Sequence, residues 1–368
     1  MFKFSIERET LLTSLLLVIG AVDKRNTLPV LSNVLLDLNQ NMLTLSGTDT
    51  EIEFTSRLVL VGSDDTGRIT VPARKFIDIC RSLNEGAVIN ISAQTDRVLV
   101  TSGRSRFVLM SLPADDYPAT PDEQPILEFQ IETRALIDIL QVTHFSMAQQ
   151  DVRFYLNGLL IELLNQEVFS VSTDGHRLAV ARVPLDTPIM NSKMILPRKG
   201  VLELLRLINE IKDEMVLIQQ TESHFYLKTC DYQFISKLVS GRFPNYKRVL
   251  PIDNDKFFLV DRDLFKQTLS RVSILANEKY RAITLDISER KLVMNAINKE
   301  QEEAVEELEV DTQGEGISIG VNASYIIDVL NTVPPGLVKL SFSEPDKSIL
   351  LESLNLPIAS YVIMPLKI

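Results

Sequence analysis

Hydrophobic and polar residues follow one another along the chain in two different rhythms. Phe4 and Ile6 are separated by one polar residue, as in a strand with one buried face, and residues 11–18 then show the spacing of a helix. A second helical pattern lies at residues 71–81. Further alternating stretches lie at residues 58–60, 98–101 and 107–112. This succession predicts an α+β fold in which two helices pack on antiparallel sheets.

The second helical pattern occurs three times at a constant spacing. Residues 71–81, 196–206 and 321–330 begin 125 positions apart. A proline or asparagine stands second in each segment, where it can open a helix. An acidic residue holds the same place in each copy, namely Asp78, Glu203 and Asp328. Each segment is therefore predicted to form a helix with one buried stripe.

Other segments repeat in the same order. The opening strand recurs at residues 129–131 and, more loosely, at 258–260, each time before a helical pattern. Solenoid repeats are about 20–50 residues long, so each copy here is long enough to be a domain. Connectors rich in proline and polar residues lie at 113–125 and 244–255. We predict three similar domains, at residues 1–122, 123–252 and 253–368.

Composition and charge narrow the class of protein. Hydrophobic residues make up 45% and charged residues 24% of the chain, as in soluble globular proteins. The apolar residues 11–19 are too few, and too close to charges, for a signal peptide or membrane span. Cys80 and Cys230 are far apart in sequence, which favours the reduced cytoplasm. A net charge of −11 argues against a protein that coats nucleic acid with its whole surface, but allows a local basic surface.

Seven short motifs are spread over the whole chain: Leu-Pro-Val-Leu at 28–31, Val-Pro-Ala-Arg-Lys-Phe at 71–76, Ser-Gly-Arg-Ser-Arg-Phe at 102–107, Phe-Ser-Met-Ala at 145–148, Thr-Asp-Gly-His-Arg-Leu-Ala-Val at 173–180, Gly-Arg-Phe-Pro at 241–244 and Met-Pro at 364–365. Together they resemble the family of bacterial DNA polymerase III beta subunits, the sliding clamps. The resemblance implies three domains of the DNA clamp fold, which close as a head-to-tail homodimeric ring around duplex DNA. It also implies a processivity factor without catalytic activity, cofactor or membrane partner.

Contact with DNA in a sliding protein should be independent of base sequence. Lys and Arg side chains that face a wide hole attract the phosphates without reading the bases. The repeated helices supply such residues at Arg74, Lys75, Arg81, Arg198, Lys199 and Arg206, and the third copy at Arg262, Lys266 and Arg271. Any one of them is more often an ordinary solvated residue. By resemblance, the residues nearest the DNA are Lys24, Arg25, Gln150, Arg153, Tyr155, Arg198 and Lys199, while Gln149 departs from the histidine common in the family.

Partner proteins are expected to bind one hydrophobic groove beside the C-terminus. The resemblance implies that they are the DNA polymerase III core, clamp-loader subunits, and other polymerases and repair proteins with short hydrophobic peptide motifs. Leu, Val and Met side chains can form an apolar floor for such a peptide, although each is more often part of the core. The implied groove residues are Leu156, Thr173, Gly175, His176, Arg177, Leu178, Pro244, Arg248, Val249, Val362, Met364, Pro365 and Leu366. Lys367 and Ile368 differ from the usual family ending.

A dimer interface is implied by the same resemblance. Six glutamates lie within residues 299–309, a run that by itself is typical of a solvated loop or edge strand. The resemblance pairs this run with basic residues of the first copy, around an apolar centre. The implied interface residues are Lys75, Arg104, Arg106, Phe107, Ile274, Leu275, Glu300, Glu302 and Glu303. Exposed ion pairs contribute little energy each and mainly set the register.

Two other functions are compatible with parts of the sequence. Asp174, His176 and Glu162 could serve a metal-dependent nucleic-acid hydrolase, but the three histidines have no metal-ligand spacing. The Thr-Asp pair at 173–174 also recurs at 48–49 without the histidine, which indicates a turn that belongs to the fold. No phosphate-binding glycine pattern is present. A peptide-binding scaffold unrelated to DNA is the third possibility.

Overall fold

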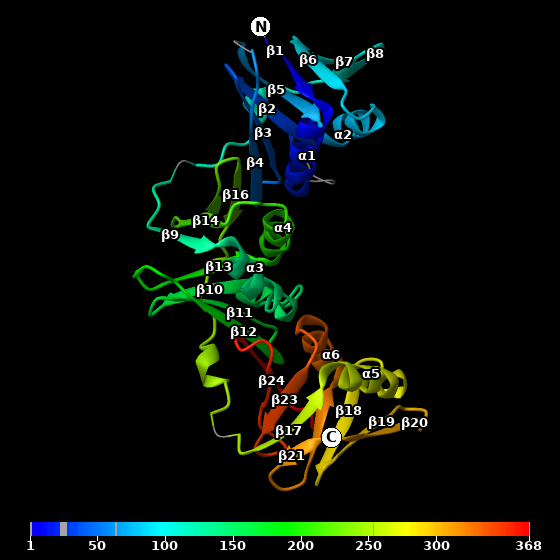
Figure 1. Ribbon diagram of the computed structural model, residues 1–368. Helices are drawn as coiled ribbons and strands as arrows, with labels where there is room; N and C mark the ends of the chain where they lie inside the picture. The colour runs from blue at the N-terminus through cyan, green and yellow to red at the C-terminus, as the bar shows by residue number, and fades with distance from the viewer. Residues whose placement is uncertain (1, 23–27, 63–64, 122, 253, 368) are drawn as a thin grey trace. The chain divides into compact units, whose positions relative to one another are not determined.

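The computed structural model describes residues 2–22, 28–62, 65–121, 123–252 and 254–367 (Figure 1). Lys24 and Arg25, predicted to contact DNA, lie outside the described residues. The chain divides into two compact units. The first consists of Met1–Thr133 and Leu202–Leu238, and the second of Arg134–Val201 and Val239–Ile368. The middle copy of the repeat therefore contributes to both units.

The first copy has the predicted succession of strands and helices. Its elements are β1 (Lys3–Glu7), α1 (Arg8–Val18), β2 (Asn33–Asn39), β3 (Met42–Thr48), β4 (Ile52–Val59), β5 (Thr66–Pro72), α2 (Ala73–Ser82), β6 (Val88–Gln94), β7 (Arg97–Ser102) and β8 (Ser105–Met110). They form two antiparallel groups of four strands, β1-β6-β7-β8 and β5-β2-β3-β4. Pro72 ends strand β5 and caps helix α2, which confirms the expected helix start.

The second and third copies repeat this order. The second has β9 (Leu127–Glu132), α3 (Thr133–Gln141), β10 (Gly158–Leu164), β11 (Glu167–Thr173), β12 (Arg177–Pro184), β13 (Ser192–Pro197), α4 (Arg198–Ile208), β14 (Met215–Gln220), β15 (His224–Lys228) and β16 (Tyr232–Lys237). The third has β17 (Lys256–Asp261), α5 (Arg262–Val272), β18 (Ala282–Ser288), β19 (Lys291–Ile297), β20 (Glu303–Glu309), β21 (Asp311–Gln313), β22 (Ile317–Asn322), α6 (Ala323–Thr332), β23 (Leu337–Phe342), β24 (Ile349–Ser353) and β25 (Ala359–Ile363). Strand β21 is an addition to the third copy.

Neighbouring copies join through their sheets. The fourth strand of one copy pairs with the last strand of the next, as β4 with β16 in the first unit and β12 with β25 in the second. These pairings create continuous sheets of eight and nine strands. Like the other end strands of the four sheets, β8 and β20 have a partner on one side only among the described residues. They differ from the other end strands because β8 is the last strand of its copy and β20 the fourth strand of its copy, and neither makes the pairing that joins neighbouring copies.

The helices are amphipathic and cover the sheets. In α2, Phe76, Ile77 and Cys80 are buried, while Asp78 and Arg81 are exposed. Helices α1 and α2 lie side by side, as do α5 and α6 (Figure 1). Burial of apolar side chains stabilises such a layer by about 25 cal/mol per Å² removed from water. The predicted α+β architecture is confirmed.

Candidate peptide pocket and DNA-contacting surface

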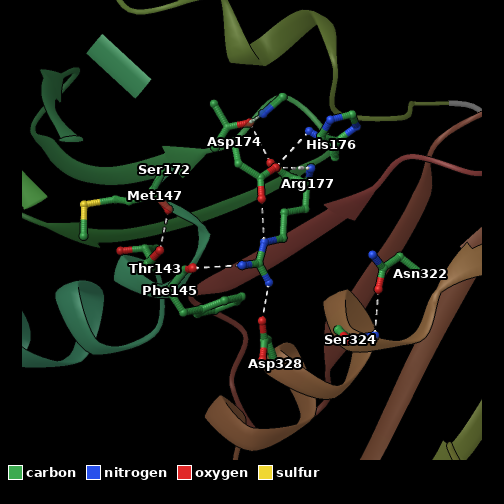
Figure 2. A network of polar contacts seen from close by, with 12 residues as sticks. Thr143, Phe145, Met147, Ser172, Asp174, His176, Arg177, Asn322, Ser324 and Asp328 are labelled. Carbon is green, nitrogen blue, oxygen red and sulfur yellow. Dashed lines mark hydrogen bonds and ion pairs between the residues drawn. The ribbon is translucent and has the colours of Figure 1, made fainter. Parts of the chain in front are cut away.

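Asp174 (Figure 2) and the preceding Thr173 shape the turn between β11 and β12. Asp174 Oδ1 accepts hydrogen bonds from the backbone N–H groups of His176 at 2.9 Å and Arg177 at 3.0 Å. The Thr173 hydroxyl donates to the Arg177 carbonyl at 2.6 Å and accepts from the Gly175 N–H at 3.1 Å. The aspartate is therefore committed to the backbone of the turn.

The first copy makes the same turn between β3 and β4. Thr48 and Asp49 form the four equivalent hydrogen bonds, at 2.8 to 3.0 Å. Both turns need a residue with positive φ, which is Gly175 at +91° and Thr50 at +76°. Glycine adopts this conformation without strain and threonine does not. The prediction that the Thr-Asp pair belongs to the fold is confirmed.

Arg177 connects this turn to the third copy of the repeat. Its guanidinium donates to Asp174 Oδ2 at 3.0 Å, to the Phe145 carbonyl at 3.1 Å and to Asp328 Oδ2 at 2.5 Å (Figure 2). Only 13% of the Arg177 side chain is exposed, against 42% for Asp328. Charge-assisted bonds of this kind are about twice as strong as neutral ones. Arg177 therefore connects strand β12 to helix α6 through this ion pair, and such an arginine contact between copies is called a tie below.

Aromatic rings enclose the Arg177 guanidinium and the neighbouring histidine. The guanidinium carbon lies 4.8 Å from the Tyr325 ring centre and 5.4 Å from that of Phe145. Tyr325 also stacks with His176, with ring centres 6.5 Å apart. Burial, together with nearby Asp174, raises the pKa of the Tyr325 hydroxyl. Tyr325 and Phe145 were not among the predicted site residues.

An apolar floor lies below the turn. Its buried members are Leu160, Val171, Leu178, Val180, Ile195, Phe243, Tyr246 and Val362, with Tyr155 and Val249 packed against them. Leu178 and Val362 face each other in the β12–β25 pairing. Leu156 is also buried, and Pro244 and Arg248 are exposed. Three of the predicted groove residues, Leu178, Val362 and Val249, thus meet in one cluster, together with Tyr155, which was predicted to contact DNA.

The C-terminal tail is tied to this surface. The Met364 N–H donates to the His176 carbonyl at 2.9 Å, and the Leu366 N–H donates to the Gly320 carbonyl at 2.8 Å. Met364, Pro365 and Leu366 are half-buried. An unattached terminus usually frays, so these bonds give the tail a defined position beside the turn.

A hollow of about 720 Å³ adjoins the floor. Of the predicted groove residues, Arg248 and Val249 line it. Its other lining residues are Leu250, Pro251, Ile252, Asn254, Asp255, Lys256, Ser343, Glu344, Lys347 and Ser348. The hollow therefore extends past the predicted set along residues 250–252 and 254–256.

The predicted DNA-contacting residues of the second unit are placed at its surface. Arg153 is exposed and pairs with Asp151 at 2.9 Å, and its hydrogen bond lowers the pKa of Asp151 to about 2. Arg198 donates to the Met147 carbonyl at 3.2 Å, and burial lowers the pKa of its guanidinium. Tyr155 packs against the apolar floor. Gln150 and Lys199 are exposed.

Several of the predicted interface residues lie in or beside the edge strands β8 and β20. Arg106 and Phe107 belong to β8, with Arg104 in the preceding turn, and Lys75 is exposed on α2. Glu303 begins β20, and Glu300 and Glu302 are exposed in the turn before it. The other glutamates of this run pair within the chain, Glu306 with Arg271 at 2.6 Å, Glu307 with Lys291 at 2.7 Å and Glu309 with Arg290 at 3.2 Å.

An exposed apolar residue follows α5. Ile274 lies in the short 3₁₀ helix Ser273–Leu275, and 76% of its surface is exposed. Leu275 beside it is half-buried. Ile274 is one of several exposed apolar residues in the described chain, and a single one does not by itself indicate an interface.

The groups considered for a hydrolase have structural partners. Asp174 bonds the turn and Arg177, and Glu162 accepts from Tyr246 at 2.5 Å and pairs with Lys193 at 2.9 Å. Burial alone would raise the pKa of Glu162, but the bonds from Tyr246 and Lys193 outweigh it and lower that pKa. Within the described residues, no group of three or more His, Cys, Asp or Glu side chains has an arrangement suited to a metal ion.

Comparison with known proteins decides the family. Models of the N-terminal, central and C-terminal domains of the DNA polymerase III beta subunit match residues 2–121, 130–245 and 247–367. The chain belongs to the DNA polymerase III beta-subunit family, the bacterial sliding clamps. A beta sliding clamp of Proteus mirabilis is 45% identical over 366 residues, covering all of both chains. The clamp identity predicted from the motifs is confirmed.

Solved sliding clamps have the same fold. A Pseudomonas aeruginosa clamp bound to griselimycin aligns with a TM-score of 0.96 and 44% identity, over 100% of this chain and 99% of that one. A Caulobacter crescentus clamp aligns with a TM-score of 0.92 and 34% identity, over 100% and 99%. The three-domain clamp fold and the sliding-clamp function in DNA replication follow, and the hydrolase alternative finds no support. Within the described chain, no helix is both long and apolar enough to cross a membrane.

Proposed function

We propose that two copies of this sliding clamp close head to tail into a ring around duplex DNA. The ring is supported by the way in which neighbouring copies pair their strands. Each copy of the repeat offers its fourth strand to the last strand of the next copy, which leaves β20 and β8 free at the two ends of the series. A contact between unlike surfaces can close into a ring. A second molecule supplies the missing strand at both edges.

The strand registers give the pairing expected between the two molecules. Corresponding places in the last strands are held by Phe107, Phe234 and Tyr361. Corresponding places in the fourth strands are held by Phe54, Ala179 and Ala304. Phe234 pairs with Phe54, and Tyr361 with Ala179. Phe107 should therefore face Ala304 of the second copy, and Ser105 should face Glu306.

Charges across this proposed pairing are complementary. With Phe107 opposite Ala304, Arg106 has Glu303 and Glu307 of the second copy as diagonal neighbours, which are within reach of a long side chain. Lys75 and Arg104 add positive charge on one side, and Glu300 and Glu302 add negative charge on the other. Such rim pairs select the partner edge, while Phe107, Ile274 and Leu275 form the apolar centre.

The proposed DNA contacts are sequence-independent. Gln150, Arg153, Tyr155, Arg198 and Lys199, together with Lys24 and Arg25, supply donors and positive charge without a base-reading element. The whole chain has a net charge of −11, so the surface outside these basic residues is negative and repels DNA. We further propose that the protein has no catalytic activity of its own and acts in the cytoplasm, since it holds DNA by encirclement.

The proposed groove receives short hydrophobic peptides of the polymerase core, the clamp loader and other replication and repair proteins. Its support is the apolar floor, the fixed tail and the hollow that continues past Arg248 and Val249. An extended peptide can place its apolar side chains on such a floor, while Arg and backbone groups orient it.

One experiment distinguishes a ring that encircles DNA from a protein that is held only by contacts to the phosphates. Protein loaded by a clamp loader onto nicked circular DNA should stay bound in 1 M NaCl, where phosphate contacts are screened. Linearising the DNA should then release it, because the ring can slide off an end. Gel filtration of the labelled complex before and after cleavage measures both. Equal loss from circular and linear DNA would rule out the ring.

A further inference from the structure

Asp328 is not one of the proposed groove residues, but it bonds one of them, Arg177. It lies on helix α6 and receives the Arg177 guanidinium at 2.5 Å, although it is not part of the apolar floor. We propose that Asp328 is a positioning residue for the peptide groove, acting through Arg177. This inference rests on the proposed peptide-binding function of that groove.

The first step is the effect of Asp328 on the orientation of Arg177. A guanidinium is planar and its donors are fixed relative to one another. With one donor held by Asp328 and another by the Phe145 carbonyl, the Nε–H must point to Asp174, which it meets at 3.0 Å. Removal of Asp328 takes away one of the three contacts that fix the plane.

The second step leads from Arg177 to the lip of the groove. Asp174 holds the turn through its Oδ1, while its Oδ2 is held by Arg177. Gly175 and His176 are exposed on that turn. The His176 carbonyl in turn accepts the Met364 N–H of the tail. A shift of Arg177 therefore moves both the lip and the tail.

Helix α6 supports the same lip at a second point. Tyr325 is three residues before Asp328 on α6, so both side chains lie on one face of the helix. Tyr325 stacks on His176 and lies under the Arg177 guanidinium (Figure 2 shows Arg177, His176 and Asp328 around this turn). The third domain thus sets the shape of a lip that belongs to the second domain.

The repeat provides a matched control. Glu203 holds the place of Asp328 on helix α4 and bonds Arg206 at 2.8 Å, within the first unit. Loss of either carboxylate removes an arginine partner at a domain junction, but only Asp328 is connected to the groove. The variants Asp328→Ala and Glu203→Ala therefore separate positioning of the groove from general support of the fold.

The experiment uses the full-length dimer and griselimycin as the probe, measured by isothermal titration calorimetry. Asp328→Ala should weaken binding about tenfold, the ratio that corresponds to one charge-assisted hydrogen bond. Asp328→Asn, which keeps the shape, should weaken it less. Glu203→Ala should leave the affinity within about twofold of wild type. NMR of the His176 ring protons should show loss of the Tyr325 ring-current shift in Asp328→Ala alone.

The outcomes separate the inference from the proposed groove. Unchanged affinity and an unchanged His176 signal in both Asp328 variants, with tight binding to wild type, would overturn the inference and leave the groove standing. Equal weakening by Glu203→Ala would also overturn it, because general loosening would then explain the effect. Absence of griselimycin binding to the wild-type protein would overturn the groove and the inference together.

Discussion

An arginine connects neighbouring copies of the repeat at each of the two junctions inside the chain. It comes from the later copy at the first junction and from the earlier copy at the second. At the first junction, Arg206 of helix α4 donates to the carbonyls of Leu16 at 3.0 Å and Leu17 at 2.6 Å, near the end of α1. At the second, Arg177 comes from the other partner, strand β12, and reaches Phe145 and Asp328. In both, the acidic residue of the repeated helix, Glu203 or Asp328, completes the tie.

Two equivalent positions lie beside these arginines, and each holds a small residue at one junction and a large residue at the other. At the centre of the 3₁₀ helix that follows the first helix of each copy stand Gly20 and Phe145. A Cβ on Gly20 would lie 2.0 Å from Arg206 Nη2, and the Phe145 ring instead lies under Arg177. On the fourth strand, Phe54 and Ala179 show the reverse order, with Arg206 over the Phe54 ring at 5.7 Å. An aromatic ring supports the arginine at each junction, Phe54 at the first and both Phe145 and Tyr325 at the second, so the strand or helix that provides the ring differs.

The third copy follows the pattern of the second junction. Its 3₁₀ helix has the large Ile274 at the centre, and its fourth strand has the small Ala304. The proposed junction between molecules should therefore resemble the second junction more than the first, with Ile274 packed against Phe107 of the other copy.

Arg177→Ala should cause the largest loss of stability among these substitutions. It removes the guanidinium that bonds Asp174 Oδ2, Asp328 and the Phe145 carbonyl, which should destabilise the second unit by about 3 kcal/mol. Hydrogen exchange at β12 and β25, followed by mass spectrometry, measures the loss. Arg182→Ala is the control, because Arg182 is mostly exposed and has a single partner at 3.5 Å. Similar effects of both substitutions would contradict the tie.

Gly20→Ala should cause the second-largest loss of stability, and this loss should be confined to the first unit. The new methyl group displaces the Arg206 guanidinium from both helix-end carbonyls, at a cost of about 2 kcal/mol. Protection of α1 and of the β4–β16 pairing against hydrogen exchange should fall, while β12 keeps its protection. If α1 is unaffected, the close approach of Arg206 to Gly20 does not hold in solution.

Leu275→Ala tests the junction between molecules. Truncation at the apolar centre of an interface typically costs about 1–2 kcal/mol, so the dimer dissociation constant should rise about tenfold. Sedimentation velocity over a dilution series gives that constant, and 1 M NaCl should weaken the dimer less than the substitution does. An unchanged constant would show that residues 273–275 lie outside the interface.

The smallest expected effect is a difference in pH dependence. Burial raises the pKa of Glu53, which faces Ile235 in the β4–β16 pairing, against the bonds from Thr120 and Thr55. Glu53 is therefore protonated more readily in the folded state, so the first unit should gain stability as the pH falls toward the unfolded value of about 4.3. The lowered pKa of Glu162 has the opposite sign, and its contribution is lost below that value.

Hydrogen exchange of β4 and β10 between pH 6 and pH 3.5, corrected for the intrinsic rate, measures this difference. Glu53→Gln should abolish the gain and Glu162→Gln the loss. A parallel change of β4 and β10 in the unsubstituted protein would contradict the assignment of the two carboxyl groups to opposite effects.

The order of elements could be predicted from the sequence, and the ties between domains could not. Periodicity located α1, α2 and the repeated Asp49 and Asp174, because each depends on neighbours within a few residues. Arg177 meets Asp328 across 151 positions. Nothing in the local pattern indicates whether β12 or α6 provides the cation, although the repeated acid at Asp328 was a signal that some cation would be there. Tyr325 and Phe145 were missed because their apolar positions also fit ordinary core residues.

The placement of the groove and interface residues stays a prediction with physical support. Leu178, Val249 and Val362 meet in one cluster, and the charged interface residues lie at two free edges. The boundaries of the three domains also remain predictions, since the middle copy is shared between two compact units.

Free strands at both ends of the series mean that assembly itself sets no upper limit on the number of molecules. The same edge-to-edge contact that completes a circle of two would build an open fibre if each successive domain turned by a slightly smaller angle. If the contacts of Arg206 beside Gly20 and of Arg177 set that angle, substitutions there, far in sequence from β8 and β20, should convert the proposed rings into filaments and leave the contact between molecules intact.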